Sequence, residues 1–189
     1  MQYLAGVDEV GRGCLAGPVI SSAVILDQDN PIIGLRDSKL LSEKRRDELF
    51  TIIRSKSIDC TIGSASHTDI DRINILNATM LSMKRAIEKL KNKNIKVYID
   101  GNQCPEINNK LQIKMESKIG GDKLFPCISS ASIIAKVTRD RYMIKMHLIY
   151  PDYGFDRNKG YPTKEHLDAI LIHGPTPIHR LTFKPELYD

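Results

Sequence analysis

Two adjacent acidic residues, Asp8 and Glu9, place the strongest constraint on how this chain can fold. They come directly after the apolar run 3–7, which is typical of a buried strand. Neighbouring carboxylates repel each other, so burying both is unfavourable unless a cation or a shared proton compensates them. The glycines of Gly11-Arg12-Gly13 allow a tight turn whose backbone N–H groups can approach a ligand. The pattern predicts either a metal-and-phosphate site or an ordinary strand end with solvated acids, and by itself it does not separate the two.

The composition is that of a globular protein. A chain of 189 residues with 41% hydrophobic and 27% charged residues can form one domain with a full core. No apolar run approaches the roughly 20 residues that a membrane helix needs. The four cysteines are too sparse for a secreted disulfide scaffold and form no C-x-x-C pair, so we expect a reduced, cytoplasmic protein. The net charge of +5 suits a polyanionic partner.

Hydrophobic periodicity predicts strands alternating with helices, and therefore an α/β fold. Two runs rich in β-branched residues, 3–8 and 19–26, predict a hairpin around the turn 11–18. Apolar residues spaced three and four apart from Ile70 to Leu90 predict an amphipathic helix. We expect further strands at 58–66, 96–100 and 111–115, and further helices at 43–54 (capped by Ser42), 127–149 and 164–172 (capped by Thr163). The chain shows no domain boundary, so we expect one domain over residues 1–189, helical from about residue 150.

A third acidic residue, Asp100, ends the strand predicted at 96–100. Because this strand follows a long helix, we expect a crossover connection and a parallel strand pair. Open α/β sheets bind ligands at the carboxyl ends of their strands, where Asp8 and Asp100 would then both lie. Asp122, in the loop predicted at 118–123, is a further candidate ligand. The alternative for Asp100 is an ordinary Asp-Gly turn.

Three other segments are candidates for contact with a nucleic acid. Hydroxyl groups, ammonium groups and backbone N–H groups near a helix N-terminus suit a phosphate, and aromatic residues beside basic ones can stack on bases or sugars. The structural alternatives are a capping loop, capping hydroxyls and a packed connector. The segments are Asp37-Ser38-Lys39, the helix start with Ser129, Ser130 and Ser132, and the aromatic, glycine-rich loop 152–162 with Tyr161.

Taken together, these segments resemble the ribonuclease HII family, the type 2 ribonucleases H. No single motif is specific, but the combination is, and the motifs occur in the family's order over nearly the whole chain. They are 6–13 (GVDEVGRG), 16–18 (AGP), 37–39 (DSK), 100–102 (DGN), 132–140 (SIIAKVTRD) and 160–163 (GYPT). The resemblance implies a ribonuclease H-like α/β fold, with a mixed β-sheet flanked by helices and a C-terminal helical extension.

The resemblance also implies four acidic residues that bind metal and catalyse, and they match Asp8, Glu9, Asp100 and Asp122. Asp140 is the rival for the fourth place, and we favour Asp122 because Gly121-Asp122 matches the family's Gly-Asp loop. Carboxylates without Cys or His are the ligands that Mg²⁺ and Mn²⁺ prefer. We expect two such ions to assist an in-line displacement, which would also relieve the repulsion between Asp8 and Glu9.

For the substrate, the resemblance implies that the backbone of Gly11, Arg12 and Gly13 reads the 2′-OH, the group that distinguishes RNA from DNA. Tyr161 would pack against the sugar at the junction. Phosphates of the DNA strand would be held by Lys39, with Ser38 beside it, and by the helix start from Ser129 to Ser132.

The implied activity is hydrolysis of the RNA strand of RNA–DNA hybrids and nicking of duplex DNA on the 5′ side of an embedded ribonucleotide. The products would carry 5′-phosphate and 3′-hydroxyl ends. The partners would be RNA–DNA hybrid and ribonucleotide-containing duplex DNA, and the roles would be ribonucleotide removal and RNA primer removal in replication and repair. We expect a monomer without membrane contact.

Three alternatives remain open. A four-carboxylate 3′–5′ exonuclease shares the metal chemistry but does not need Gly11-Arg12-Gly13. Ribonuclease HIII carries an additional N-terminal domain, for which a motif beginning at residue 6 would leave no room. A non-enzymatic nucleic-acid-binding module explains the positive charge, but it leaves four acids that would repel a phosphate backbone.

Overall fold

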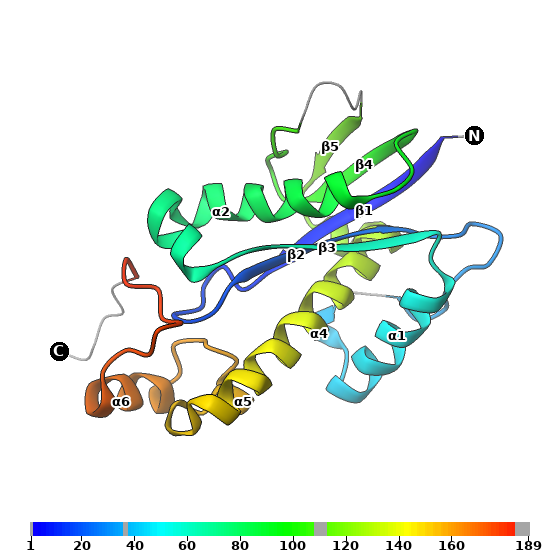
Figure 1. Ribbon diagram of the computed structural model, residues 1–189. Coiled ribbons are helices and arrows are strands. Elements are labelled where there is room, and N and C mark those ends of the chain that lie inside the picture. Colours follow the sequence, from blue (N-terminus) through cyan, green and yellow to red (C-terminus); the bar gives the residue numbers. More distant parts are fainter. Residues whose placement is uncertain (1, 36–37, 108–112, 184–189) are drawn as a thin grey trace.

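The computed structural model describes residues 2–35, 38–107 and 113–183 (Figure 1). Asp37 and the side chain of Lys39, both part of a predicted anion site, lie outside this description. Within the described part, five strands form one mixed sheet in the order β3-β2-β1-β4-β5. They are β1 (Tyr3–Val10), β2 (Val19–Ile25), β3 (Asp59–Ala65), β4 (Ile95–Asp100) and β5 (Lys114–Lys118). The predicted α/β fold with a mixed sheet flanked by helices is confirmed.

The central strand β1 has an antiparallel neighbour on one side and a parallel neighbour on the other. It forms the predicted hairpin with β2, whereas β4 runs parallel to it. In the parallel register Val7 pairs with Ile99. The next residues along the two strands are Asp8 and Asp100, so both acids lie at the same edge of the sheet.

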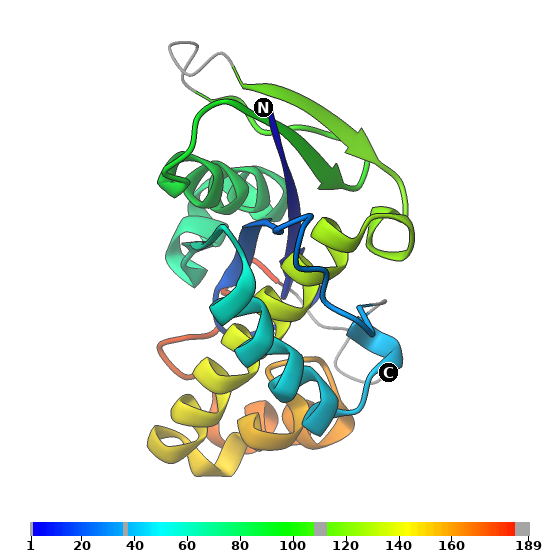
Figure 2. The same cartoon turned by 90° about the vertical axis from the view of Figure 1, so that its right-hand side faces the viewer.

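The helices cover both faces of the sheet. The long helix α2 packs on β3 and β2, while α4 crosses the other face over β1 and β2, with α1 against it (Figures 1 and 2). The described helices are η1 (Ser38–Leu40), α1 (Glu43–Lys56), α2 (His67–Lys89), α3 (Gly121–Leu124), α4 (Pro126–Ile149), η3 (Pro151–Tyr153), α5 (Phe155–Asn158) and α6 (Lys164–His173). Ser42 and Thr163 cap α1 and α6 as predicted, and α2 is kinked at Asn74.

Alternate residues of β1 face the two helical layers. Ala5 and Val7 are fully buried in the core cluster that contains residues of α2. A Cβ atom on Gly6 would lie 2.1 Å from the carbonyl carbon of Cys127, so glycine is needed where α4 crosses the strand. Because side chains alternate along a strand, Asp8 is on the same side of the sheet as Gly6 and faces α4.

The segment between β4 and α4 differs from the sequence prediction. The strand expected at 111–115 is β5, which the structure describes from Lys114 onward. The loop expected at 118–123 contains the short helix α3, which follows Gly120 in the left-handed conformation (φ 66°). Asp122 therefore lies in a helical turn and not in a loop.

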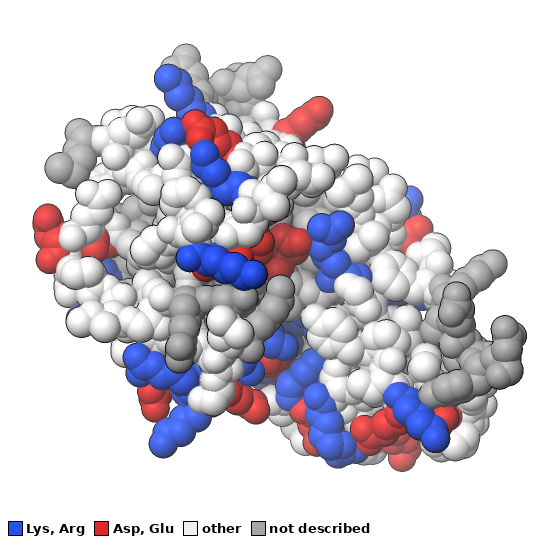
Figure 3. Space-filling view, turned by 180° about the vertical axis from the view of Figure 1, so that it is seen from behind, with Lys and Arg blue, Asp and Glu red and all other residues white. Residues whose placement is uncertain are grey.

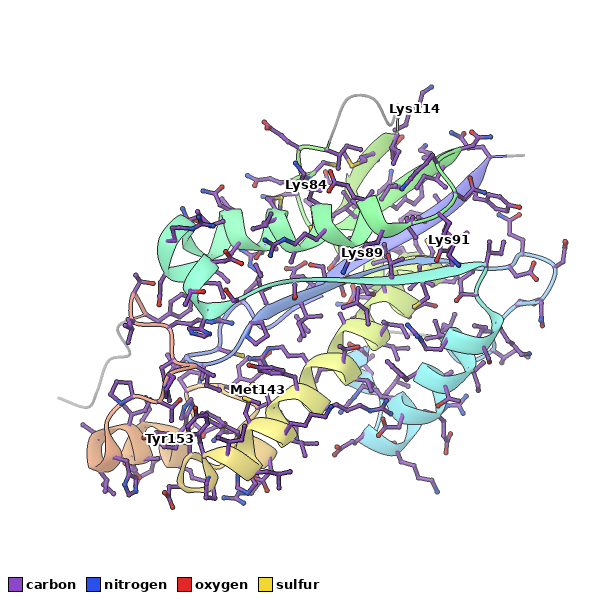
Figure 4. All side chains as sticks on the ribbon, in the orientation of Figure 1. Lys84, Lys89, Lys91, Lys114, Met143 and Tyr153 are labelled. Carbon is purple, nitrogen blue, oxygen red and sulfur yellow. The ribbon has the colours of Figure 1, made fainter. Side chains whose placement is uncertain are left out.

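Two expectations for the second half of the chain were wrong. Phe125 is the N-cap of α4, so Ser129, Ser130 and Ser132 lie inside the helix and do not cap it. The loop expected at 152–162 contains η3 and α5. Tyr153 and Phe155 are buried there in a cluster with Met143 of α4, so the packed connector is the correct interpretation for these two aromatic residues. Figure 4 labels Tyr153 and Met143 in this part of the molecule.

The protein surface carries charges of both signs. On the face opposite to that of Figure 1, Lys and Arg are interspersed with Asp and Glu and form no single field of one sign (Figure 3). None of the described helices is long and apolar enough to cross a membrane. The prediction of one domain over residues 1–189 stays a prediction.

Candidate functional site

Asp8 lies nearly buried at the edge where β1 and β4 end, with 6% of its surface exposed. Its Oδ1 atom accepts a hydrogen bond from the backbone N–H of Glu9 at 2.7 Å. Burial raises the pKa of Asp8 well above its usual value, and the charges of Glu9 and Asp100 raise it further. A hydrogen bond from Ser132 acts in the opposite direction. The repulsion that the adjacent acids implied is therefore present in the folded protein.

Glu9 has a cation beside it. Nη1 of Arg12 lies 3.4 Å from Oε1 of Glu9, at the rim of the turn. Burial raises the pKa of Glu9, and Arg12 partly offsets this effect. The described residues contain no such ion pair for Asp8. The uncompensated charge of the acidic pair is thus concentrated on Asp8.

A backbone hydrogen bond brings Asp122 to the same place. Gly121 donates its N–H to Oδ1 of Asp100 at 2.7 Å, which joins the start of α3 to the end of β4. Asp122 is the next residue and is 7% exposed. Asp140 instead accepts from Nζ of Lys136 at 2.9 Å and borders a different cavity. The arrangement places Asp122, and not Asp140, with Asp8 and Asp100.

A cleft of about 350 Å³ collects these groups. Residues from both strand ends, η1, α3, α4 and the segment before α6 surround it. They are Asp8, Glu9, Val10, Ser38, Asp100, Asp122, Ser132, Lys136 and Tyr161. All four predicted carboxylates therefore face one cavity, together with a cation and an aromatic ring.

The chemistry of this lining suits a hard divalent cation. Its donor atoms are carboxylate and hydroxyl oxygens, and neither Cys nor His lines the cleft. Among the residues that the structure describes, no three His, Cys, Asp or Glu side chains converge closely enough to form a complete metal-binding group. The acids line the walls of the cleft, so a bound ion would need further oxygen ligands from water or phosphate.

Other residues that were predicted to contact the nucleic acid are less well placed to do so. Ser38 and Ser132 line the cleft, and their hydroxyl oxygens lie 2.8 Å apart. Ser129 is 2% exposed within α4 and does not line the cleft. Gly11 and Gly13 belong to the turn that follows β1, outside the lining. The position of the Lys39 side chain lies outside the described part of the structure.

Tyr161 lies at the cleft with 37% of its surface exposed. Nζ of Lys136 is 6.0 Å from its ring centroid, and the guanidinium carbon of Arg139 is 5.9 Å from it. Burial raises the pKa of the Tyr161 hydroxyl, and the nearby Cys14 contributes in the same direction. An exposed aromatic face beside two cations can accept a sugar ring of a nucleic acid.

Three basic residues in or beside the site were not among the predicted site residues. Lys136 is the cation of the cleft. Arg139 donates to the carbonyls of Pro18 (3.0 Å), Ala16 (2.9 Å) and Lys159 (2.7 Å). Arg180 donates to the carbonyls of Gly11, Arg12 and Gly17 at 2.6 to 3.0 Å. Lys136 and Arg139 belong to the family motif at 132–140, whereas none of the quoted motifs includes Arg180.

The chain is similar to known proteins over nearly its whole length. The sequence model described as "Ribonuclease HII" matches residues 5–186. A ribonuclease HII of Polaromonas sp. (strain JS666 / ATCC BAA-500) is 54% identical over 182 residues, which are 96% of this chain and 89% of the relative. The crystal structure of ribonuclease H2 from Pyrococcus horikoshii OT3 superposes with a TM-score of 0.78 at 28% identity, over 96% of this chain and 94% of that chain.

A more distant structure shares the fold alone. Bst-RNase HIII, solved in complex with Mn²⁺, superposes with a TM-score of 0.70 at 15% identity. The match covers 96% of this chain and 67% of that chain.

Proposed function

Because this chain belongs to the ribonuclease HII family, and is therefore an endoribonuclease of the ribonuclease H type, we propose that it nicks duplex DNA on the 5′ side of an embedded ribonucleotide. It also cuts the RNA strand of RNA–DNA hybrids, and its products carry 5′-phosphate and 3′-hydroxyl ends. Ribonucleotide removal and RNA primer removal are the roles that this activity serves. The observation that carries the proposal is the single cleft lined by Asp8, Glu9, Asp100 and Asp122.

We assign these four acids to the binding of divalent ions, two Mg²⁺ or two Mn²⁺. When bound, such ions make an attacking water more acidic and stabilise the charge on the leaving 3′ oxygen. Asp8 anchors the site because it is buried beside the charges of Glu9 and Asp100, so a nearby cation would stabilise its charged form. Hydrogen bonds from the N–H of Glu9 and from Ser132 fix the orientation of its carboxylate. Asp100 is held in the same way by Gly121.

The turn Gly11-Arg12-Gly13 reads the 2′-OH of the ribonucleotide. Arg180 donates to the carbonyls of Gly11 and Arg12 and so fixes the backbone of the turn, whose N–H groups we assign to the sugar. A 2′-OH can accept these hydrogen bonds, whereas deoxyribose has no group to do so. Tyr161 packs against the sugar at the junction, and Lys136 contacts a phosphate beside it.

A closed circular DNA that contains one ribonucleotide tests this proposal. With Mg²⁺ or Mn²⁺ the protein should convert the circle to its nicked form, and a circle made only of deoxyribonucleotides should stay closed. The new end should carry a 5′-phosphate. An exonuclease cannot open an uninterrupted strand, so nicking also separates the two kinds of nuclease. An uncut circle with both metals would overturn the proposal.

A single substitution tests the assignment of Tyr161. Tyr161→Ala removes the ring that packs against the sugar, and we take the contribution of base–aromatic stacking, about 1–3 kcal/mol, as its scale. Cleavage at a single ribonucleotide should therefore fall by roughly 5- to 150-fold. An unchanged rate would remove Tyr161 from the site.

A further inference from the structure

Two buried histidines form a hydrogen-bonded pair beneath Tyr161. His166 is 0% exposed and His179 is 5% exposed, and their Nε2 atoms lie 3.0 Å apart. Nδ1 of His166 lies 2.9 Å from the carbonyl oxygen of Tyr161. Nδ1 of His179 lies 2.8 Å from the backbone nitrogen of Thr176 and 2.8 Å from its hydroxyl oxygen. The two rings therefore connect Tyr161 to the segment before Arg180.

The two ends of this connection determine where its protons lie. A carbonyl oxygen can only accept, so Nδ1 of His166 must carry a proton and donate it to Tyr161. A backbone N–H can only donate, so Nδ1 of His179 must be unprotonated. In the neutral rings, Nε2 of His179 then carries a proton and Nε2 of His166 accepts it. All four hydrogen bonds, including the one that the Thr176 hydroxyl donates to Nδ1 of His179, are satisfied at once in this one arrangement.

Both rings have to be neutral for this arrangement. A second proton on His166 would place two N–H groups against each other, and one on Nδ1 of His179 would oppose the N–H of Thr176. Burial lowers the pKa of His166, and burial together with the neighbouring His166 lowers the pKa of His179 to about 4. Both rings are therefore neutral at neutral pH.

We propose that His166 and His179 are positioning residues for Tyr161, and that their opposite tautomers hold its backbone in register with the turn that reads the ribose. The inference rests on the proposed function, because it assigns Tyr161 to the sugar at the junction. The carbonyl of Tyr161 also accepts from the N–H of Thr163 at 2.8 Å, so both of its lone pairs are engaged. Of these two hydrogen bonds, only the one from the His166 imidazole comes from outside the segment 161–163.

The contacts around the pair link it to the residues that follow Gly11-Arg12-Gly13, and the neighbouring Arg180 donates to the carbonyls of Gly11 and Arg12 themselves. His179 forms an isolated antiparallel β-bridge with Ala16. Within it, the N–H of Arg180 donates to the carbonyl of Leu15 at 2.8 Å. The N–H of Leu15 donates in turn to the carbonyl of Gly160 at 2.8 Å, directly before Tyr161. A closed ring of contacts therefore runs from Tyr161 through the two histidines to Leu15 and back.

Aromatic side chains fill the space around the rings. Phe155 lies edge-on to His166 with centroids 5.3 Å apart, and Tyr153 lies 5.4 Å from His179. Tyr153 is held by its hydroxyl, which donates to the carbonyl of Gly174 at 2.6 Å, and Figure 4 shows it between α4 and α6. This packing leaves the imidazoles little room to turn, so a shift of either histidine is passed on to Tyr161.

The tautomers can be measured in the unmodified protein by ¹⁵N NMR of the imidazole rings at neutral pH. We expect His166 to be protonated at Nδ1 and His179 at Nε2. The same tautomer on both rings, or a charged ring, would overturn the inference. This measurement requires no substrate and no variant, so it is independent of whether the proposed activity is correct.

Two substitutions of His166 separate its two hydrogen bonds. The amide of Asn lies where Nδ1 lies, so His166→Asn keeps the donor to Tyr161 and loses His179. The amide of Gln lies where Nε2 lies, so His166→Gln keeps the contact with His179 and loses the donor to Tyr161. We expect kcat/KM on a DNA duplex with one ribonucleotide to fall about tenfold for His166→Gln and no more than about threefold for His166→Asn. Equal losses in the two variants would contradict a role through Tyr161.

The Tyr161→Ala background provides the matched control. There the difference between His166→Gln and His166→Asn should disappear, because the ring that they position is absent. A difference that persists would assign the histidines a purely structural role. Cleavage by the unmodified protein is measured alongside, so failure of the proposed function would appear there, and failure of this inference only in the variants.

Discussion

Nη2 of Arg180 donates a hydrogen bond to the carbonyl oxygen of Gly11 at 2.6 Å, across 169 positions of the sequence. The same guanidinium donates to Arg12 at 2.8 Å and, through Nε, to Gly17 at 3.0 Å. Burial lowers the pKa of Arg180 to about 10, so the group stays charged at neutral pH. The C-terminal part of the chain thus holds the turn that follows Asp8 and Glu9.

Replacing this guanidinium should loosen the turn. Arg180→Lys keeps the charge but cannot donate to three carbonyls in the same fork geometry. With hydrogen bonds to charged groups at about 1.5–3 kcal/mol each, we expect the free energy of unfolding to fall by about 2–4 kcal/mol. Discrimination between ribose and deoxyribose at the cleavage site should also weaken. Urea unfolding and cleavage of matched substrates check both effects.

Arg141 is the control for Arg180. It pairs with Asp47 at 2.8 Å, and its side chain is 52% exposed. Exposed pairs of this kind contribute about 0–1 kcal/mol, so Arg141→Lys should leave stability and discrimination nearly unchanged. Equal effects of the two substitutions would contradict the role given to Arg180.

Removing the charge of Asp8 should stabilise the metal-free protein. The pKa of Asp8 is raised on folding, so the folded state binds its proton more tightly than the unfolded state does. The stability that this proton provides is fully present below the unfolded pKa and is lost as pH rises through the folded pKa. In EDTA, Asp8→Asn should therefore melt at a higher temperature than the natural protein at pH 7, and the difference should shrink as pH falls.

Divalent ions should reverse the order of the two melting temperatures. A ligand that binds only the folded state raises its free energy of unfolding by RT ln(1 + [L]/Kd). Mn²⁺ should raise the melting temperature of the natural protein and have little effect on Asp8→Asn, whose cleavage activity should be abolished. A variant that responds to Mn²⁺ and cuts at the natural rate would show that Asp8 is not a ligand.

The same substitution, Asp to Asn, tests whether Asp122 or Asp140 is the fourth carboxylate. Asp122→Asn removes a charge from the cleft and should lower kcat by about a hundredfold or more, as expected for a group acting on the transition state. Asp140→Asn breaks only the pair with Lys136 and should retain activity within several-fold. Initial rates at saturating Mg²⁺ decide between them, and the reverse ranking would make Asp140 the fourth carboxylate.

Lys136 should contribute to substrate binding through charge. Lys136→Gln should weaken binding of a nucleic-acid duplex and reduce the slope of log K against log salt by about 1, as expected for one lost phosphate contact. Lys84 lies on α2, across the sheet from α4 (Figure 4), so Lys84→Gln should leave the slope unchanged. Two variants with the same slope would argue against a phosphate at Lys136.

Much of the site could be predicted from local sequence pattern. The apolar run before Asp8 and the strand that ends at Asp100 were recognisable as strands, and the long helix between them implied the crossover that makes them parallel. The order of the strands then placed both acids at one edge, as the register Val7 with Ile99 confirms. The choice of Asp122 over Asp140 depended on a motif, and its role as a ligand stays a prediction.

What the sequence alone determined is the order of strands and helices, the family and the acids at the sheet edge, because these follow from periodicity and short motifs. Only the tertiary structure showed that Arg180 holds the turn at Gly11 and that His166 and His179 join Tyr161 to Thr176. Each such contact depends on which distant segment packs beside a buried polar group. A buried guanidinium or imidazole needs partners, but nothing in the neighbouring sequence specifies which carbonyl supplies them.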